Sequence, residues 1–392
     1  MRDRLKRRIF PLLASLGLLL VGMFTTTLGP TWSGKAEWAL PYDLWGTLIA
    51  TVRLVHGNVG GLYTQPTGLV SLPGAAVILL PCAAVIAATG LSLVIPGPHN
   101  LHPPVWLLAG PYEIALCCVT LFAADALAEQ LGVTKWKRGM LAVASAVALW
   151  NVSARWGHPE DAVAVGLLLY AVLALPMLLA PLPWRRMPAF LVRSALPSAV
   201  LLGVAALANW HATYSSVTSQ PNSPVINHPT IWTSLAPHMS NTNVAAGPAR
   251  LATIVLACCC ALAVRRRWLA QAAESEGGAW PPSLLADVLW WVALALALRS
   301  FFEPVMVSYY PWPVLAVALI PAATLGWIRL VAASVLAGGL TALAQGPSHS
   351  VWIWWLPLVI GLACMLALSR PRTAHAAGRS TELTATASPE TV

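Results

Sequence analysis

Apolar stretches recur along the chain and are separated by short polar segments. An α-helix needs about 20 apolar residues to cross the hydrocarbon core of a membrane. Stretches close to that length lie at residues 9–29, 106–129, 139–154, 161–181, 189–209, 250–264, 283–301, 309–325, 328–345 and 351–369. The pattern predicts an all-α fold, a polytopic membrane helix bundle with about ten transmembrane helices.

Composition agrees with this pattern. Of the 392 residues, 58% are hydrophobic and only 9% are charged, which is far more apolar than a soluble globular protein. We therefore predict a single membrane domain over residues 1–370. Residues 371–392 are rich in Thr, Ala and Ser without apolar periodicity, so we predict a disordered cytoplasmic tail there.

Basic residues cluster between the apolar stretches, as the positive-inside rule expects of cytoplasmic loops. The clusters are Lys135/Lys137/Arg138, Arg185/Arg186, Arg265/Arg266/Arg267 and Arg370/Arg372. They predict a multi-pass cell-membrane protein with both termini in the cytoplasm, and outer loops at 30–68 and 210–249. Because these clusters carry most of the net charge of +9, the charge does not indicate a nucleic-acid partner.

The apolar region 69–95 does not fit a simple alternation of spans. The N-terminus and Lys135 are both predicted inside, so an even number of crossings must separate them. Spans 9–29 and 106–129 already supply two, which leaves zero or two for this region. Pro73 and Pro81 interrupt it, so we favour a re-entrant or broken helix. The alternative is eleven spans with one end of the chain inverted.

The first outer loop contains an amphipathic pattern. Residues 43–57 carry apolar side chains at 44, 45, 48, 49, 52 and 55, which predicts a helix lying flat on the outer membrane surface. Asp43 begins this helix, where a carboxylate caps backbone amides. The same carboxylate is a candidate general base at the interface, and both interpretations stay open.

A compact polar segment, WGHPED at 156–161, separates two apolar stretches. Ionisable residues beside a membrane are costly and mark candidate functional sites. The structural interpretation is a helix start, where proline and acids are favourable. In the functional interpretation, Arg155 and His158 bind a phosphate or hydroxyl, or Glu160 and Asp161 hold a divalent cation.

A third polar segment follows the stretch at 283–301. Arg299 and Glu303 are four residues apart and can pair across one helix face, while Tyr309 and Tyr310 add aromatic surface. The alternatives are a structural ion pair within an aromatic belt, or an aromatic platform for a sugar or lipid-linked phosphate. The large outer loop at 210–249 is predicted to be an ordered lid or binding loop.

Motifs of other chemistries are missing from the sequence. It contains no Walker loop, dinucleotide fingerprint, zinc-protease motif or nucleophile elbow, which argues against ATP-driven or dinucleotide chemistry. The seven cysteines lie inside apolar stretches without the spacing of a metal site. We expect no cofactor and no bound metal, and a divalent cation is not indicated.

Three blocks of sequence resemble a known family. They are YDLWGTLIATVRLVHGNVGGLYTQP with the following SLPGAAVILLP, then WGHPEDAVAVGLLLYA, then FFEPVMVSYYPWPVLAVAL. They are similar to the C superfamily of polytopic glycosyltransferases. The resemblance is greatest to the actinobacterial polyprenyl-phosphate-mannose-dependent mannosyltransferases of family 87 and their uncharacterised membrane relatives, and it is spread over residues 9–325.

This resemblance implies transfer of a hexose, with mannose favoured, from a polyprenyl-phosphate donor to a lipid or glycan acceptor of the cell envelope. The family's catalytic base is an acid in the first outer loop, which corresponds to Asp43. Arg53, Arg155 or His158 would meet the phosphate. The other expected substrate-binding residues are Glu160, Asp161, Glu303, Tyr309 and Tyr310. Many members carry two adjacent acids in this loop, whereas Asp43 stands alone, so a catalytically silent member is an alternative.

A transporter or flippase of a lipid-linked or polar solute is the competing hypothesis. The observation that supports it is a set of acids within or beside apolar stretches, namely Glu113, Asp125 and Asp287. A transporter would gather such acids around a cavity near the membrane midplane. An enzyme would instead gather the outer-face candidates at one end of the bundle.

Overall fold

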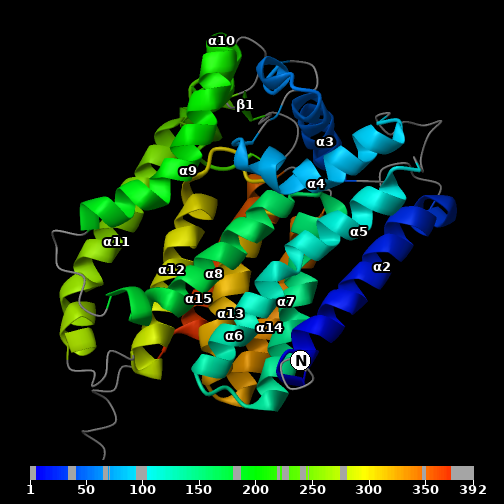
Figure 1. The fold of residues 1–392 in the computed structure, drawn as a ribbon. Coiled ribbons are helices and arrows are strands. Elements are labelled where there is room, and N and C mark those ends of the chain that lie inside the picture. Colours follow the sequence, from blue (N-terminus) through cyan, green and yellow to red (C-terminus); the bar gives the residue numbers. More distant parts are fainter. Residues whose placement is uncertain are drawn as a thin grey trace, which may run out of the picture.

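The computed structural model describes residues 6–33, 41–64, 69, 71–93, 104–179, 187–218, 221–222, 229–238, 244–245, 247–273, 280–346 and 350–371. Across these residues the chain is almost entirely helical, and Figure 1 shows its helices packed into a bundle. The predicted all-α fold is confirmed. Apart from position 371, the predicted disordered tail lies outside the described residues.

Most of the helices overlap the predicted apolar stretches, and three others lie in the first outer loop, in the region 69–95 and in the large outer loop. They are α2 (Ile9–Ser33), α3 (Tyr42–Val55), α4 (Gly74–Thr89), α5 (Trp106–Cys117), α6 (Val119–Gln130), α7 (Lys135–Leu149), α8 (Pro159–Leu179), α9 (Met187–Ala208), α10 (Trp210–Thr218), α11 (Gly247–Ala273), α12 (Pro282–Phe302), α13 (Trp312–Thr324), α14 (Trp327–Ala344) and α15 (Leu356–Ser369). Short π-helical segments cover Asn151–Arg155 and Val351–Trp355. The two-residue strands β1 (Pro221–Asn222) and β2 (Val244–Ala245) pair antiparallel.

Among the described residues, five helical stretches are long and apolar enough to cross a membrane. They are Ile9–Thr26, Trp106–Gln130, Pro282–Phe302, Trp327–Ala344 and Val351–Ser369. The molecule is therefore a helical membrane protein by the length and composition of these helices. The count of about ten spans is not reached by this criterion and stays a prediction.

Helix α13 forms the centre of the bundle. Nearly all of its side chains are buried, and it packs against α6, α7, α12, α14 and α15. A helix that is apolar all round is buried in protein or in lipid, and here the neighbouring helices cover it. The preceding residues Tyr309 and Tyr310 are consequently held at one end of the bundle core, because the amide of Trp312 bonds the Tyr309 carbonyl at 3.1 Å.

Helices α3 and α4 pack together across that end of the bundle (Figure 1). The apolar face of α3, including Leu44, Trp45 and Leu48, is fully buried in one cluster with Leu79 and Ile86 of α4. The predicted amphipathic helix is thus present. Its apolar face is covered by protein, whereas a helix lying on a membrane surface would turn that face to lipid.

The helices before and after the region 69–95 meet at one end of the bundle. The indole nitrogen of Trp106, at the start of α5, donates to the Thr26 hydroxyl of α2 at 3.1 Å. Thr26 and Trp106 therefore lie at the same end of the bundle. Pro81 lies inside α4, which continues through it, so the expected break is wrong, and the described part of the region holds one short helix whose re-entrant character stays a prediction.

Candidate active site

His158 is hydrogen-bonded to a carboxylate through each of its ring nitrogens. Its Nε2 lies 3.0 Å from Asp43 Oδ2, and its Nδ1 lies 2.9 Å from Glu160 Oε1. Asp43 comes from α3 and Glu160 from the first turn of α8, so two segments far apart in the chain meet at this imidazole. Two of the predicted sites therefore form one cluster.

The two carboxylates determine the charge of His158. Burial alone lowers the pKa of His158, but the hydrogen bonds to Asp43 and Glu160 and the charges of Glu160 and Asp161 outweigh it and raise the pKa to about 10. The ring is therefore an imidazolium at neutral pH, donating from both nitrogens. It orients the Asp43 carboxylate and is not itself available as a base.

Asp43 is the accessible member of this cluster. Its side chain is 42% exposed, compared with 15% for His158 and 17% for Glu160. The residue that caps α3 is Pro41, without a side-chain cap bond. The interpretation of Asp43 as the helix cap is therefore wrong: the carboxylate lies in the first turn and is hydrogen-bonded by His158 instead.

Gly157 allows the segment before α8 to approach α3 closely. Its φ of 69° lies in the left-handed region, which side chains other than glycine rarely adopt. A Cβ atom at this position would lie 2.5 Å from the Cβ of Pro41 and 2.8 Å from that of Leu44. Glycine is thus required both by the backbone turn and by the contact that brings His158 to Asp43.

Aromatic rings form one side of the cluster. The Tyr309 ring centroid lies 4.2 Å from that of His158 and 6.1 Å from that of Trp156, and Tyr310 packs edge-on against Tyr309 at 5.3 Å. Burial, together with Tyr310, Asp161 and Asp43, raises the pKa of Tyr309 well above its usual value. The phenol therefore stays protonated beside the imidazolium.

A second set of charges lies next to these rings. The Arg299 guanidinium lies 4.0 Å from the Tyr310 ring centroid, and its Nε is 3.7 Å from Glu303. Glu303 is fully buried and also lies 3.5 Å from Arg250 Nε. The i,i+4 pair expected from the sequence is present, and Asp161 interacts electrostatically with both Arg299 and His158.

Part of the outer loop packs onto the chain around Glu303. The Thr230 hydroxyl donates to the Glu303 carbonyl at 2.8 Å. The Trp232 indole donates to the Phe301 carbonyl at 2.6 Å, and the Thr233 hydroxyl donates to the Pro304 carbonyl at 2.5 Å.

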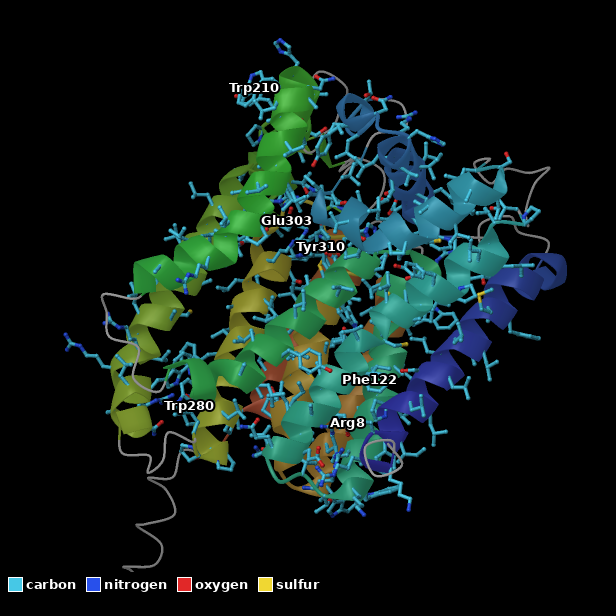
Figure 2. The ribbon with its side chains drawn as sticks, viewed as in Figure 1. Arg8, Phe122, Trp210, Trp280, Glu303 and Tyr310 are labelled. Atoms are coloured by element: carbon cyan, nitrogen blue, oxygen red, sulfur yellow. The ribbon has the colours of Figure 1, made fainter. Side chains whose placement is uncertain are left out.

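Figure 2 shows Glu303 and Tyr310 at the same end of the bundle as α3 and α4, whereas Arg8 lies at the other end. The described part of the outer loop therefore packs beside Glu303, and its role as a lid or binding loop stays a prediction.

The two other expected phosphate ligands, Arg53 and Arg155, lie at different distances from the cluster. Arg53 donates to the carbonyls of Gly61 and Thr64, both at 3.4 Å, and ten helical residues separate it from Asp43 by about 15 Å along the axis. The Arg155 guanidinium lies 6.0 Å from the Trp156 ring. Arg155 thus borders the site, while Arg53 does not reach it.

Glu113 was not among the expected site residues. It is completely buried on α5, accepts a bond from Cys117 Sγ at 3.0 Å and interacts electrostatically with Glu160 and His158. In the sequence, the signal that could have identified Glu113 as a functional residue was its position as a lone acid inside an apolar stretch. Only the packing of α5 against α8 places that acid behind the cluster.

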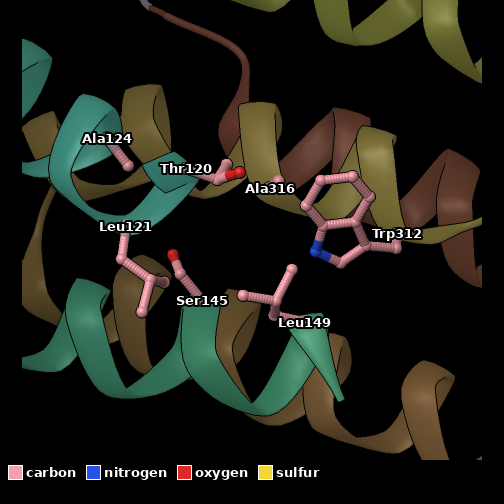
Figure 3. A pocket seen from close by; sticks show the side chains of 7 residues that line it. All are labelled: Thr120, Leu121, Ala124, Ser145, Leu149, Trp312 and Ala316. Carbon is pink, nitrogen blue, oxygen red and sulfur yellow. The ribbon is translucent and has the colours of Figure 1, made fainter. Parts of the chain in front are cut away.

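A narrow crevice between α6, α7 and α13, shown in Figure 3, leaves no room for a water molecule. Its lining residues are Thr120, Leu121, Ala124, Ser145, Leu149, Trp312 and Ala316. Within the described ranges, no group of three or more His, Cys, Asp or Glu side chains is arranged to hold a metal ion.

Comparisons with known proteins do not place the chain in a family. No family model, curated protein or solved structure matches it. The chemistry of the site is therefore argued from its own residues.

Proposed function

We propose that the protein is an integral membrane glycosyltransferase that moves a hexose, with mannose favoured, from a polyprenyl-phosphate donor to a cell-envelope acceptor at the outer face. Asp43 acts as the general base. The observation that carries this proposal is the pairing of the exposed Asp43 carboxylate with the partly buried His158 imidazolium at 3.0 Å. A carboxylate held in one orientation beside a fixed cation is well arranged to accept a proton from a bound hydroxyl.

The reaction needs one displacement. An acceptor hydroxyl attacks the anomeric carbon of the sugar and passes its proton to Asp43. The bond between that carbon and the phosphate oxygen breaks, and polyprenyl phosphate leaves with the electron pair. Trp156 and Tyr309 offer ring faces to the sugar, while His158 and Arg299 supply positive charge for the phosphate. No nucleotide-binding element is needed, because a lipid phosphate reaches the site from the membrane.

The distribution of the remaining acids favours an enzyme over a transporter. Asp125 pairs with Arg8 and Arg138, and Asp287 pairs with Arg267. These acids are engaged in ion pairs and do not gather with Glu113 around one cavity. A transporter or flippase remains the alternative, and solute flux in proteoliposomes without sugar transfer would favour it. The exposure of Asp43 argues against a blocked, silent site.

The proposal predicts that Asp43→Asn abolishes transfer in a folded protein. Asparagine keeps the size of the side chain and an oxygen for His158, but it cannot accept the proton. We expect the rate of transfer from radiolabelled polyprenyl-phosphate mannose in proteoliposomes to fall by about 10²–10⁴-fold. Asp287→Asn, which removes an acid paired with Arg267, is the matched control and should retain activity. Full activity of Asp43→Asn would refute the assignment of the base.

A further inference from the structure

Asn151 lies just before the segment that carries His158. It begins the π-helical segment Asn151–Arg155, which leads directly into Trp156, Gly157 and His158. Its side chain is 2% exposed. A buried primary amide has two donor hydrogens and an accepting oxygen to satisfy, so its partners identify what the side chain holds in place.

The partners of Asn151 come from two other parts of the bundle. Its Nδ2 donates to the Ser308 carbonyl at 3.3 Å and to the Thr341 carbonyl at 2.9 Å, while its Oδ1 accepts from Gln345 Nε2. Carbonyl oxygens only accept, so the amide nitrogen has to face them. Every hydrogen-bonding group of the side chain is thereby used, and its orientation is determined.

These bonds connect the two segments that face each other in the site. Ser308 immediately precedes Tyr309, whose ring lies 4.2 Å from that of His158. Asn151 therefore joins the segment carrying His158 to the segment carrying Tyr309 at a second point, inside the protein. The two contacts together define the separation of the segments.

The π-helical turn makes such support necessary. The Trp156 amide bonds the Asn151 carbonyl at 3.2 Å, and the His158 amide bonds the Val152 carbonyl at 2.8 Å, both wider turns than in an α-helix. Turns of this kind are uncommon and occur frequently at functional sites. A less favourable backbone conformation persists where the surrounding structure holds it, and the Asn151 amide provides that hold here.

We propose that Asn151 is a positioning residue, which sets the place of His158 between Tyr309 and Asp43 and thereby orients the Asp43 carboxylate. Asn151 itself lies beneath the site and does not touch the substrate. The kinetic consequence of this inference rests on the proposed transfer reaction. Its structural consequence, the environment of the His158 imidazole, does not depend on that reaction.

The test replaces Asn151 by leucine, which keeps a similar size and the same charge but removes every hydrogen bond of the amide. We expect kcat for transfer to fall by about 100-fold, as for a displacement of about 1 Å in an active site, with little change in KM for the donor. We also expect the pKa of His158, followed by NMR of ¹³C-labelled histidine in detergent, to move from about 10 toward 6.5. The His158→Gln protein identifies the signal.

Thr341→Val is the matched control, because its hydroxyl bonds Ala337 within α14 at 2.8 Å and its carbonyl can still accept from Asn151. If Asn151→Leu does not fold, Gln345→Met removes only the bond to Oδ1 and should cause a smaller change in the same direction. Normal kcat and an unchanged His158 pKa in Asn151→Leu would overturn the inference, as would equal losses in the control. Wild-type protein without transferase activity would refute the proposed function, while the His158 titration would still decide the role of Asn151.

Discussion

At the scale of single residues, the central feature is an imidazolium held between two carboxylates. Glu160 is two positions from His158 in the sequence, so this contact belongs to the local start of α8. Asp43 is 115 positions away, and nothing in the local sequence predicts its bond to His158. The same residue types therefore indicate a helix start when considered locally and a candidate site when considered in three dimensions.

This arrangement predicts a loss of stability at alkaline pH. The pKa of His158 is about 10 in the folded protein, against an ordinary value of 6.5. Because the folded value is the higher one, the stabilisation is fully present below pH 6.5 and is lost as the pH rises to about 10. The thermal unfolding midpoint of the purified protein in detergent should fall across this interval.

His158→Gln is the reference for that measurement. It keeps a polar side chain but carries no titrating charge, so its unfolding midpoint should vary less between pH 6.5 and 10 than that of the wild type. Identical pH profiles for the two proteins would contradict the charged state assigned to His158.

At the scale of elements, the site depends on how the turn before α8 meets the start of α3. The sequence predicts both helices, with α3 beginning beside Asp43 and α8 beginning beside Pro159. It does not indicate that they touch. The contact between the turn and α3 requires Gly157, because only a residue without a Cβ atom fits against Pro41 and Leu44.

Gly157→Ala should therefore separate α3 from the turn. The left-handed backbone alone costs about 1–3 kcal/mol for a residue other than glycine, and the new methyl group would overlap Pro41. We expect a lower unfolding midpoint, and a His158 pKa that falls as Asp43 moves away. Thermal unfolding and histidine NMR measure the two effects.

Gly46→Ala, within α3 itself, is the matched control. A Cβ atom at Gly46 meets nothing within 4 Å, and alanine favours a helix over glycine by about 0.5–1 kcal/mol. This variant should be at least as stable as the wild type. A similar loss in both variants would show that α3 tolerates no added methyl group, and would remove the specific role of Gly157.

At the scale of the whole molecule, charges join the helices at the end opposite the site. Asp125 accepts from Arg8 at 2.8 Å and from Arg138 at 2.6 Å, and Glu129 lies 2.7 Å from Arg8. Arg138 also donates to the Arg7 carbonyl at 2.9 Å. The cluster ties the N-terminal residues and α2 to α6 and α7, which anchors the first helix as a part of the bundle.

Removing the central acid of this cluster should destabilise the molecule strongly. Asp125 is 2% exposed and Arg138 7%, so Asp125→Asn leaves a buried guanidinium without its principal partner, which costs about 3–5 kcal/mol. The unfolding midpoint in detergent measures this loss. Asp287→Asn, whose partner Arg267 is 44% exposed, should lose only about 0–1 kcal/mol. Equal shifts in the two variants would contradict the structural role of the cluster.

The sequence by itself determined the helical membrane character and the positions of the helices, because apolar periodicity and helix length follow directly from the order of residues. It also singled out Asp43, His158, Glu160 and Tyr309, since polar side chains beside apolar stretches are costly. It left open whether Asp43 caps α3 or acts as a base, and it placed Arg53 among the phosphate ligands, because one-dimensional spacing does not show which segments meet. Only the tertiary structure paired Asp43 with His158, directed Arg53 to the carbonyls of Gly61 and Thr64 and brought Glu113 behind the cluster, since these contacts depend on how the helices pack.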